Sequence, residues 1–134
     1  MLVMVLMQSC ENVFHNDKLD YLWRLDSVEY IDGVDFNGKT CSKECPEGVW
    51  FGFARDLVRV EDKRSGFCII GVLTDQGDQL SFDFTMYQEE KWGADDGLKQ
   101  IGVGTMISSF NVTELNNKEM VLTGSKTVLR FTRW

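Results

Sequence analysis

Residues 66–88 read GFCIIGVLTDQGDQLSFDFTMYQ, and the pattern of this stretch predicts the fold. Its second half alternates large apolar residues with small or polar ones, the apolar ones being Leu80, Phe82, Phe84 and Met86. Successive side chains of a strand point to opposite faces, so these four are predicted to share one buried face. The denser apolar run at residues 67–73 predicts a second strand, and the polar segment around Gly77 predicts the turn between them. Because a β-hairpin is not stable alone, the rest of the chain must supply further strands.

Short apolar segments separated by turn residues continue on both sides of this hairpin. Further strands are predicted within residues 19–31, 49–54, 57–60, 106–115, 120–123 and 127–134. In the first of them the apolar register changes after Asp26, which predicts a bulge or bend there. Residues 89–104 lack the strand rhythm, and Asp95 or Asp96 is predicted to cap a helical turn that runs through Gln100. The pattern predicts an all-β fold, an antiparallel meander of about eight strands that closes as a barrel or packs as a sandwich.

Length and charge exclude several classes of protein. A chain of 134 residues corresponds to one domain that is long enough to bury a core. The formal net charge of −7 argues against a nucleic-acid-binding protein, because binding to phosphate backbones needs a basic face. No apolar run reaches the roughly 18 residues that a membrane-spanning helix requires. The sequence therefore indicates an acidic, mainly β domain that does not bind nucleic acid.

The first ten residues, MLVMVLMQSC, combine an apolar run with a small residue and a cysteine. This order resembles the end of a bacterial lipoprotein signal peptide, in which cleavage precedes a cysteine that receives the lipid. Residues 1–10 are accordingly predicted to be a signal remnant that ends at the lipid-acceptor Cys10. Residues 11–18 are polar and aperiodic, which predicts a flexible tether, and residues 19–134 would form the folded domain. The alternative is an ordinary apolar N-terminus with a buried cysteine.

The chain resembles the small lipocalin-like lipoproteins of Gram-negative cell envelopes. The resemblance rests on Cys10, the short tether, the first-strand Trp23 and the C-terminal run FNVTELNNKEMVLTGSKTVLRFTRW. It implies a small lipocalin-like β-barrel, anchored to an envelope membrane and facing the periplasm or the cell surface. It also implies that Trp23 packs at the closed end of the barrel against Arg130 of the last strand, through a cation–π contact. The sequence departs from the family at Tyr21, where lipocalins usually carry a glycine.

Few residues suit catalysis or metal binding. His15, the only histidine, falls in the predicted tether, which argues against a Ser-His or Cys-His nucleophile pair. The cysteines lack the spacing of a zinc site, and the Asp- and Gly-rich turns lack the bidentate glutamate of an EF-hand. We therefore predict a protein that is not an enzyme and uses no metal or cofactor. The minor alternative is a carboxylate-based enzyme, which would need paired acids inside the barrel mouth.

Six phenylalanines are the candidate interior of the barrel. They are predicted to point inward together: Phe51, Phe53, Phe82, Phe84, Phe110 and Phe131. An eight-stranded barrel has an interior that is either filled by side chains or wide enough for one small ligand. With a cavity, the resemblance implies binding of a small hydrophobic molecule. With a filled interior and an exposed apolar loop around Trp92, the alternative is a protein-interaction module, such as an inhibitor of a secreted protease.

Three cysteines remain if Cys10 carries a lipid. Cys41 and Cys45 belong to a predicted loop, and Cys68 belongs to a predicted core strand. An envelope compartment favours disulfides. We predict one bridge from the loop to the strand, with Cys45 as the partner of Cys68 because it is nearer in sequence. The alternatives are a bridge between Cys41 and Cys45 and a free, buried Cys68.

Overall fold

The computed structural model describes residues 19–86 and 94–134, which form a closed antiparallel β-barrel. Its eight wall strands follow one another around the barrel in chain order: β1 (Leu22–Tyr30), β3 (Val49–Ala54), β4 (Leu57–Asp62), β5 (Phe67–Asp75), β6 (Gln79–Asp83), β7 (Ile107–Leu115), β8 (Glu119–Thr123) and β9 (Thr127–Arg133). Pairing of β1 with β9 closes the wall, so the prediction of an antiparallel barrel of about eight strands is confirmed. The short β2 (Lys43–Glu44) pairs with the end of β1 as an extra strand outside the wall.

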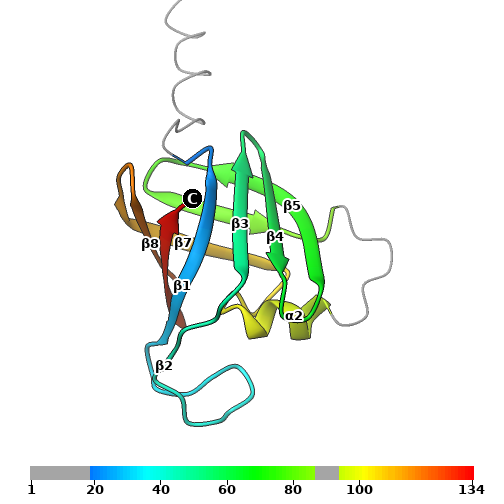
Figure 1. The fold of residues 1–134 in the computed structure, drawn as a ribbon, viewed down its shortest axis with the longest axis vertical. Helices are drawn as coiled ribbons and strands as arrows, with labels where there is room; N and C mark the ends of the chain where they lie inside the picture. The colour runs from blue at the N-terminus through cyan, green and yellow to red at the C-terminus, as the bar shows by residue number, and fades with distance from the viewer. Residues whose placement is uncertain (1–18, 87–93) are drawn as a thin grey trace, which may run out of the picture.

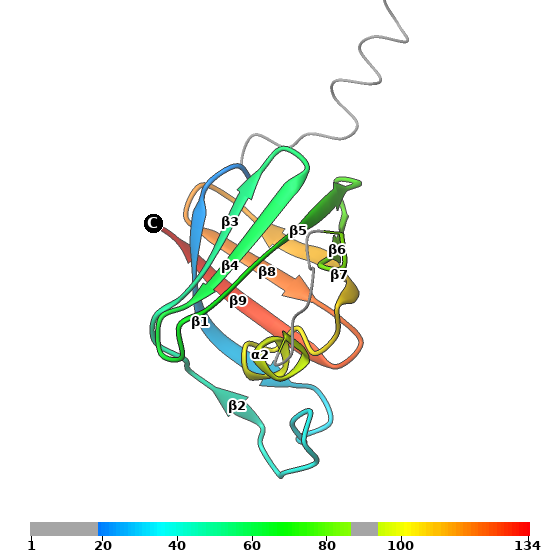
Figure 2. The same ribbon diagram turned by 90° about the vertical axis from the view of Figure 1, so that its right-hand side faces the viewer.

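The two ends of the barrel differ (Figures 1 and 2). The helix α2 (Ala94–Gln100) lies across one end, which also carries the β4–β5 and β8–β9 turns and the long β1–β3 connection. We call this end the mouth. At the opposite end, which we call the base, residue 19 enters the barrel and β9 ends. In the described part of the chain no helix combines the length and the apolar character needed to cross a membrane.

The central hairpin forms as β5 and β6, with one departure from prediction. Leu80, Phe82 and Phe84 are almost completely buried, as the alternation predicts. Met86, by contrast, is 67% exposed. The strand ends at Asp83, whose carboxylate accepts a hydrogen bond of 2.9 Å from the backbone N–H of Thr85 and turns the chain away from the wall.

The predicted bulge in the first strand is confirmed. The register of β1 against β9 shifts between Leu25 and Ser27, so Asp26 is the extra residue. Its carboxylate receives hydrogen bonds from Thr132 Oγ1 and from Arg24 Nε. The helical turn through Gln100 is also confirmed, but it begins at Ala94, so Asp95 and Asp96 lie inside its first turn.

Candidate ligand site at the barrel rim

The interior of the barrel is filled with aromatic side chains. All six predicted phenylalanines are buried and belong to one hydrophobic core cluster. The Phe82 ring is central, with its centroid 5.6 Å from that of Phe110, 6.0 Å from Phe84 and 6.1 Å from Phe53. Phe51 packs edge-on against Phe131 at 5.0 Å. Rings at these separations are in contact, so the phenylalanines form a packed core rather than the lining of a calyx.

The mouth is closed by α2 and the residues that follow it. Leu98 and Ile101 are completely buried and point into the barrel. The linker between α2 and β7, residues 101–106, is bound to the barrel wall, because Thr127 Oγ1 donates a hydrogen bond of 2.7 Å to the carbonyl of Gly102. A Cβ atom at Gly102 would come within 2.6 Å of Val28, so the approach of the linker to β1 requires a glycine. The mouth of the barrel is therefore occupied by the chain itself.

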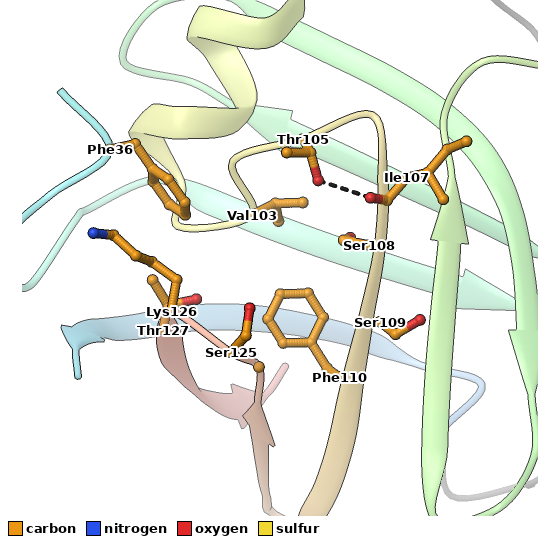
Figure 3. Close-up of a pocket in the computed structure, with 11 residues that line it drawn as sticks. Phe36, Val103, Thr105, Ile107, Ser108, Ser109, Phe110, Ser125, Lys126 and Thr127 are labelled. Atoms are coloured by element: carbon orange, nitrogen blue, oxygen red, sulfur yellow. Dashed lines mark hydrogen bonds between the residues drawn. The ribbon is translucent and has the colours of Figure 1, made fainter. Parts of the chain in front are cut away.

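A pocket of about 410 Å³ remains beside α2 and the residues that follow it, at the rim of the mouth (Figure 3). We call it the rim pocket. The α2–β7 linker, the start of β7, the β8–β9 turn and the β1–β3 connection supply its walls: Phe36, Val103, Thr105, Ile107, Ser108, Ser109, Phe110, Gly124, Ser125, Lys126 and Thr127. Its volume falls within the range of small-molecule sites, roughly 300–1,000 Å³.

The rim pocket combines two aromatic side chains with a buried hydroxyl group that has no hydrogen-bond partner. Phe36 and Phe110 lie on opposite sides of it (Figure 3). Ser108 Oγ is inaccessible to solvent and has no hydrogen-bond partner among the described residues. A buried hydroxyl without a partner is costly, so it marks a position where a ligand atom or a water molecule would be stabilised. The hydroxyl of Thr105, in contrast, is engaged at 2.7 Å with the carbonyl of Ile107.

Lys126 places a positive charge at the outer edge of the rim pocket. Its Nζ lies 3.1 Å from Asp32 Oδ2 and 5.9 Å from the centroid of the Phe36 ring. The hydrogen bond from Lys126 holds the pKa of Asp32 below its usual value. An ammonium group has three donors, so Lys126 can bind a ligand anion beside Asp32.

The predicted pair Trp23–Arg130 does not form. Arg130 is exposed, with its guanidinium 3.8 Å from Glu29. The residue of β9 opposite Trp23 is Arg133, and its guanidinium stacks on Tyr21, 3.4 Å from the ring centroid. Trp23 is completely buried, and its indole N–H donates a hydrogen bond of 3.1 Å to the carbonyl of Leu19. An arginine of the last strand therefore does stack on an aromatic ring at the base, but the ring is that of Tyr21 and not of Trp23.

The predicted Cys45–Cys68 disulfide is also absent, since Cys41, Cys45 and Cys68 are all free. Cys68 lies in the predicted strand, β5, but its side chain is exposed, so the alternative of a free, buried Cys68 is wrong as well. Its neighbour Ile69 is the buried one, and strand alternation then turns Cys68 outward. Cys10, His15 and the loop around Trp92 lie outside the described residues.

The rim pocket was not predicted from the sequence. Phe36, Ser108 and Lys126 come from separate connections and strand ends, where no periodic pattern indicates direction. The one available signal was Phe36, a large apolar residue between two turn motifs.

Comparisons with known proteins agree with the fold. The sequence profile of the lipocalin-like domain matches residues 4–134. A crystal structure of a lipocalin-like protein from Bacteroides uniformis superposes with a TM-score of 0.65 at 17% identity, covering 87% of this chain and 99% of that one. An uncharacterized protein from Bacteroides eggerthii gives a TM-score of 0.64 at 18% identity with the same coverage. A search of curated proteins found no match. At these identities the two structures establish the shared fold alone.

Proposed function

The chain belongs to the lipocalin-like domain family, and from this premise we propose that it is a non-enzymatic binding protein of the cell envelope. It binds a small amphipathic molecule at the rim pocket instead of in the barrel interior. The observation that carries the proposal is that the interior is packed with phenylalanine and closed by α2, while the rim keeps a pocket with an unpartnered hydroxyl.

The lining of the rim pocket defines the class of ligand. Phe36 and Phe110 suit an apolar body, either a short aliphatic chain or an aromatic ring. Lys126 and Ser108 Oγ suit an anionic, hydrogen-bond-accepting head such as a carboxylate. The predicted small hydrophobic ligand thus becomes a small amphipathic anion in this proposal.

Calorimetry with matched ligands tests this site. Octanoate is expected to bind and neutral octanol to bind more weakly, because only octanoate carries the charge that Lys126 attracts. The substitution Lys126→Met keeps most of the length of the side chain, removes its charge, and should weaken octanoate binding about fivefold to tenfold. Lys118→Met, in the β7–β8 turn at the base, is the matched control. Octanoate affinity that is equal in the wild type and Lys126→Met would contradict the proposal.

The second candidate function is the protein-interaction module, such as an inhibitor of a secreted protease. The filled interior favours it, because a barrel without a cavity can still present its loops and walls to a partner protein. Inhibition of proteases secreted by the same organism, retained by Lys126→Met, would support this candidate over the rim pocket.

A further inference from the structure

The outer wall of the barrel carries a groove that the proposed function does not use. Antiparallel pairing places outward-facing residues of adjacent strands directly opposite one another: Leu22 faces Gly52, Gly52 faces Arg59, and Arg59 faces Ile70. Trp134 extends this row beside β1, because its backbone N–H donates a hydrogen bond of 2.9 Å to the carbonyl of Leu22. We call the row and the hollows along it the outer-wall groove.

Two tryptophans form a corner at one end of the outer-wall groove. The indole rings of Trp50 and Trp134 are perpendicular, with centroids 5.0 Å apart. Trp134 is 77% exposed, although burial of so large an apolar surface would be favourable. Exposed aromatic side chains that gather on one surface mark binding sites more often than isolated ones do. The two perpendicular rings offer flat apolar surfaces to a ligand.

The groove has the size of a small-molecule site. One hollow of about 380 Å³ lies among Trp50, Trp134, Glu61 and Lys63, and a second of about 460 Å³ extends toward Tyr21, Leu57 and Ile70. Leu22, Gly52 and Arg59 line both hollows, so the two adjoin on the outer wall. Each volume falls in the range of small-molecule sites, roughly 300–1,000 Å³, and suits a ligand of a few rings.

Gly52 is the floor of the groove, and its backbone conformation does not require a glycine. It is not among the glycines with positive φ. A Cβ atom there would meet only Leu22 Cδ1 at 3.6 Å and the carbonyl of Arg59 at 4.0 Å, which are ordinary contacts. The backbone at position 52 can therefore accept a side chain, and that side chain would occupy the hollow.

The polar groups of the groove balance one another. Arg59 Nη2 lies 3.5 Å from Glu61 Oε2, so this cation and this anion are paired. Lys63 lines the first hollow and Asp20 lines the second, so the groove carries two cationic and two anionic side chains. Hydrogen-bond donors and acceptors are thus both present beside the indoles, without a strong local charge. This combination favours an uncharged ligand over an anion or a cation.

We propose that the outer-wall groove binds a neutral oligosaccharide. A pyranose ring has one face of C–H bonds, which packs on an indole, and an edge of hydroxyl groups, which both donate and accept hydrogen bonds. The Trp50–Trp134 corner takes the face of one sugar, and Arg59, Glu61 and Lys63 bind its hydroxyls. Further sugars of the oligosaccharide lie over Gly52 and extend toward Tyr21. The inference goes beyond the proposed function, because it uses none of the residues of the rim pocket.

Titration of the protein with linear neutral oligosaccharides tests this inference. The probes are cello-, xylo-, manno- and malto-oligosaccharides. Binding is measured by calorimetry and by the change in intrinsic tryptophan fluorescence. At least one series should bind and shift the fluorescence. Gly52→Val fills the floor and Trp134→Ala removes one side of the corner, so each should weaken binding about tenfold or more. Met86→Ala removes a similarly exposed apolar side chain that lines neither the groove nor the rim pocket, and should leave affinity unchanged.

Three results would overturn the inference. The first is that no oligosaccharide of the panel binds, and the second is that Gly52→Val binds as well as the wild type. The third is a dimer in sedimentation that Gly52→Val or Trp134→Ala dissociates, since the groove would then be covered by a second copy. Gly52→Val should retain octanoate binding and Lys126→Met should retain sugar binding, so failure of one site is distinguishable from failure of the other.

Discussion

Phe84 and Asp83 are adjacent residues with opposite environments. Phe84 is completely buried in the aromatic core, whereas the Asp83 side chain faces outward and hydrogen-bonds Thr85. Phe84→Ala should therefore destabilise the protein by about 3–5 kcal/mol, because the variant loses burial and leaves a cavity. Asp83→Ala should destabilise the protein far less, because it removes only local hydrogen bonds with Thr85. Urea unfolding of both variants measures the difference, and equal losses would contradict the alternation.

Asp62 and Arg64 give the fold a predicted pH dependence. Burial opposes ionisation of Asp62, but Arg64 Nε at 3.0 Å and Nη2 at 2.9 Å outweigh it, so the pKa of Asp62 lies below its usual value. A lowered folded-state pKa stabilises the fold at pH values above the unfolded-state pKa, roughly 4, and the stabilisation is lost as pH falls through the folded-state pKa.

Removal of the partner of Asp62 tests that dependence. Arg64→Gln should lower the free energy of unfolding at neutral pH by about 1–2 kcal/mol, less than for a fully buried pair because Arg64 is 40% exposed. The deficit should shrink in acid, where Asp62 is protonated in both proteins. Arg59→Gln, which breaks the exposed pair with Glu61, is the control and should change stability little. A deficit that is independent of pH would contradict this account.

Strand alternation explains which residue-level predictions were correct. Where one face is clearly apolar, as at Leu80 and Phe82, alternation in the sequence was sufficient. Residues 67–73 are apolar on both faces, so the direction of Cys68 could not be read from that run. In β9 the buried Phe131 could have shown that Arg133 faces inward and Arg130 outward. The family resemblance pointed to Arg130 instead.

At the scale of elements, α2 shows what the sequence could not predict. The break in strand rhythm predicted a helical turn, but nothing local indicates that its apolar side closes the mouth. That role depends on long-range packing: a Cβ atom at Gly97 would come within 2.5 Å of the Phe67 ring, and Arg64 Nη2 lies 3.4 Å from the carbonyl of Gln100. The rim pocket has the same origin, because it exists only where α2 and its linker meet the wall.

The fit of α2 against Phe67 gives a prediction opposite to helix propensity. In an exposed helix Gly→Ala stabilises by about 1 kcal/mol. Gly97→Ala should instead destabilise by about 1–3 kcal/mol, because the new methyl group overlaps the Phe67 ring and α2 must lift. Asp96→Ala, exposed on the same helix, is the control and should stay within about 0.5 kcal/mol of the wild type. Thermal unfolding, with hydrogen exchange at the α2 amides, measures both variants, and a more stable Gly97→Ala would contradict the close contact.

For the whole molecule, the even succession of strands and turns was sufficient to predict the class of fold, because each strand pairs with its neighbour in the chain. Closure through β1 and β9 completes the barrel with no crossover. The sequence could not show whether the interior is open, since six phenylalanines suit either a lining or a plug. Only their mutual contacts, such as 5.6 Å between Phe82 and Phe110, identify a plug.

The arrangement of the two ends gives the last prediction. Residue 19 enters at the base, while α2 and the rim pocket lie at the mouth (Figure 1). In the proposed envelope protein, a lipid on Cys10 would thus hold the base toward the membrane, and a tether of eight to ten residues spans roughly 16–19 Å. The full-length gene, expressed in a Gram-negative host with any missing signal residues restored, should incorporate labelled palmitate, and Cys10→Ala should abolish the label. Cys45→Ala, which removes an exposed free thiol of the folded domain, is the matched control and should keep it. Label that persists in Cys10→Ala would remove the anchor and, with it, the outward orientation of the rim pocket.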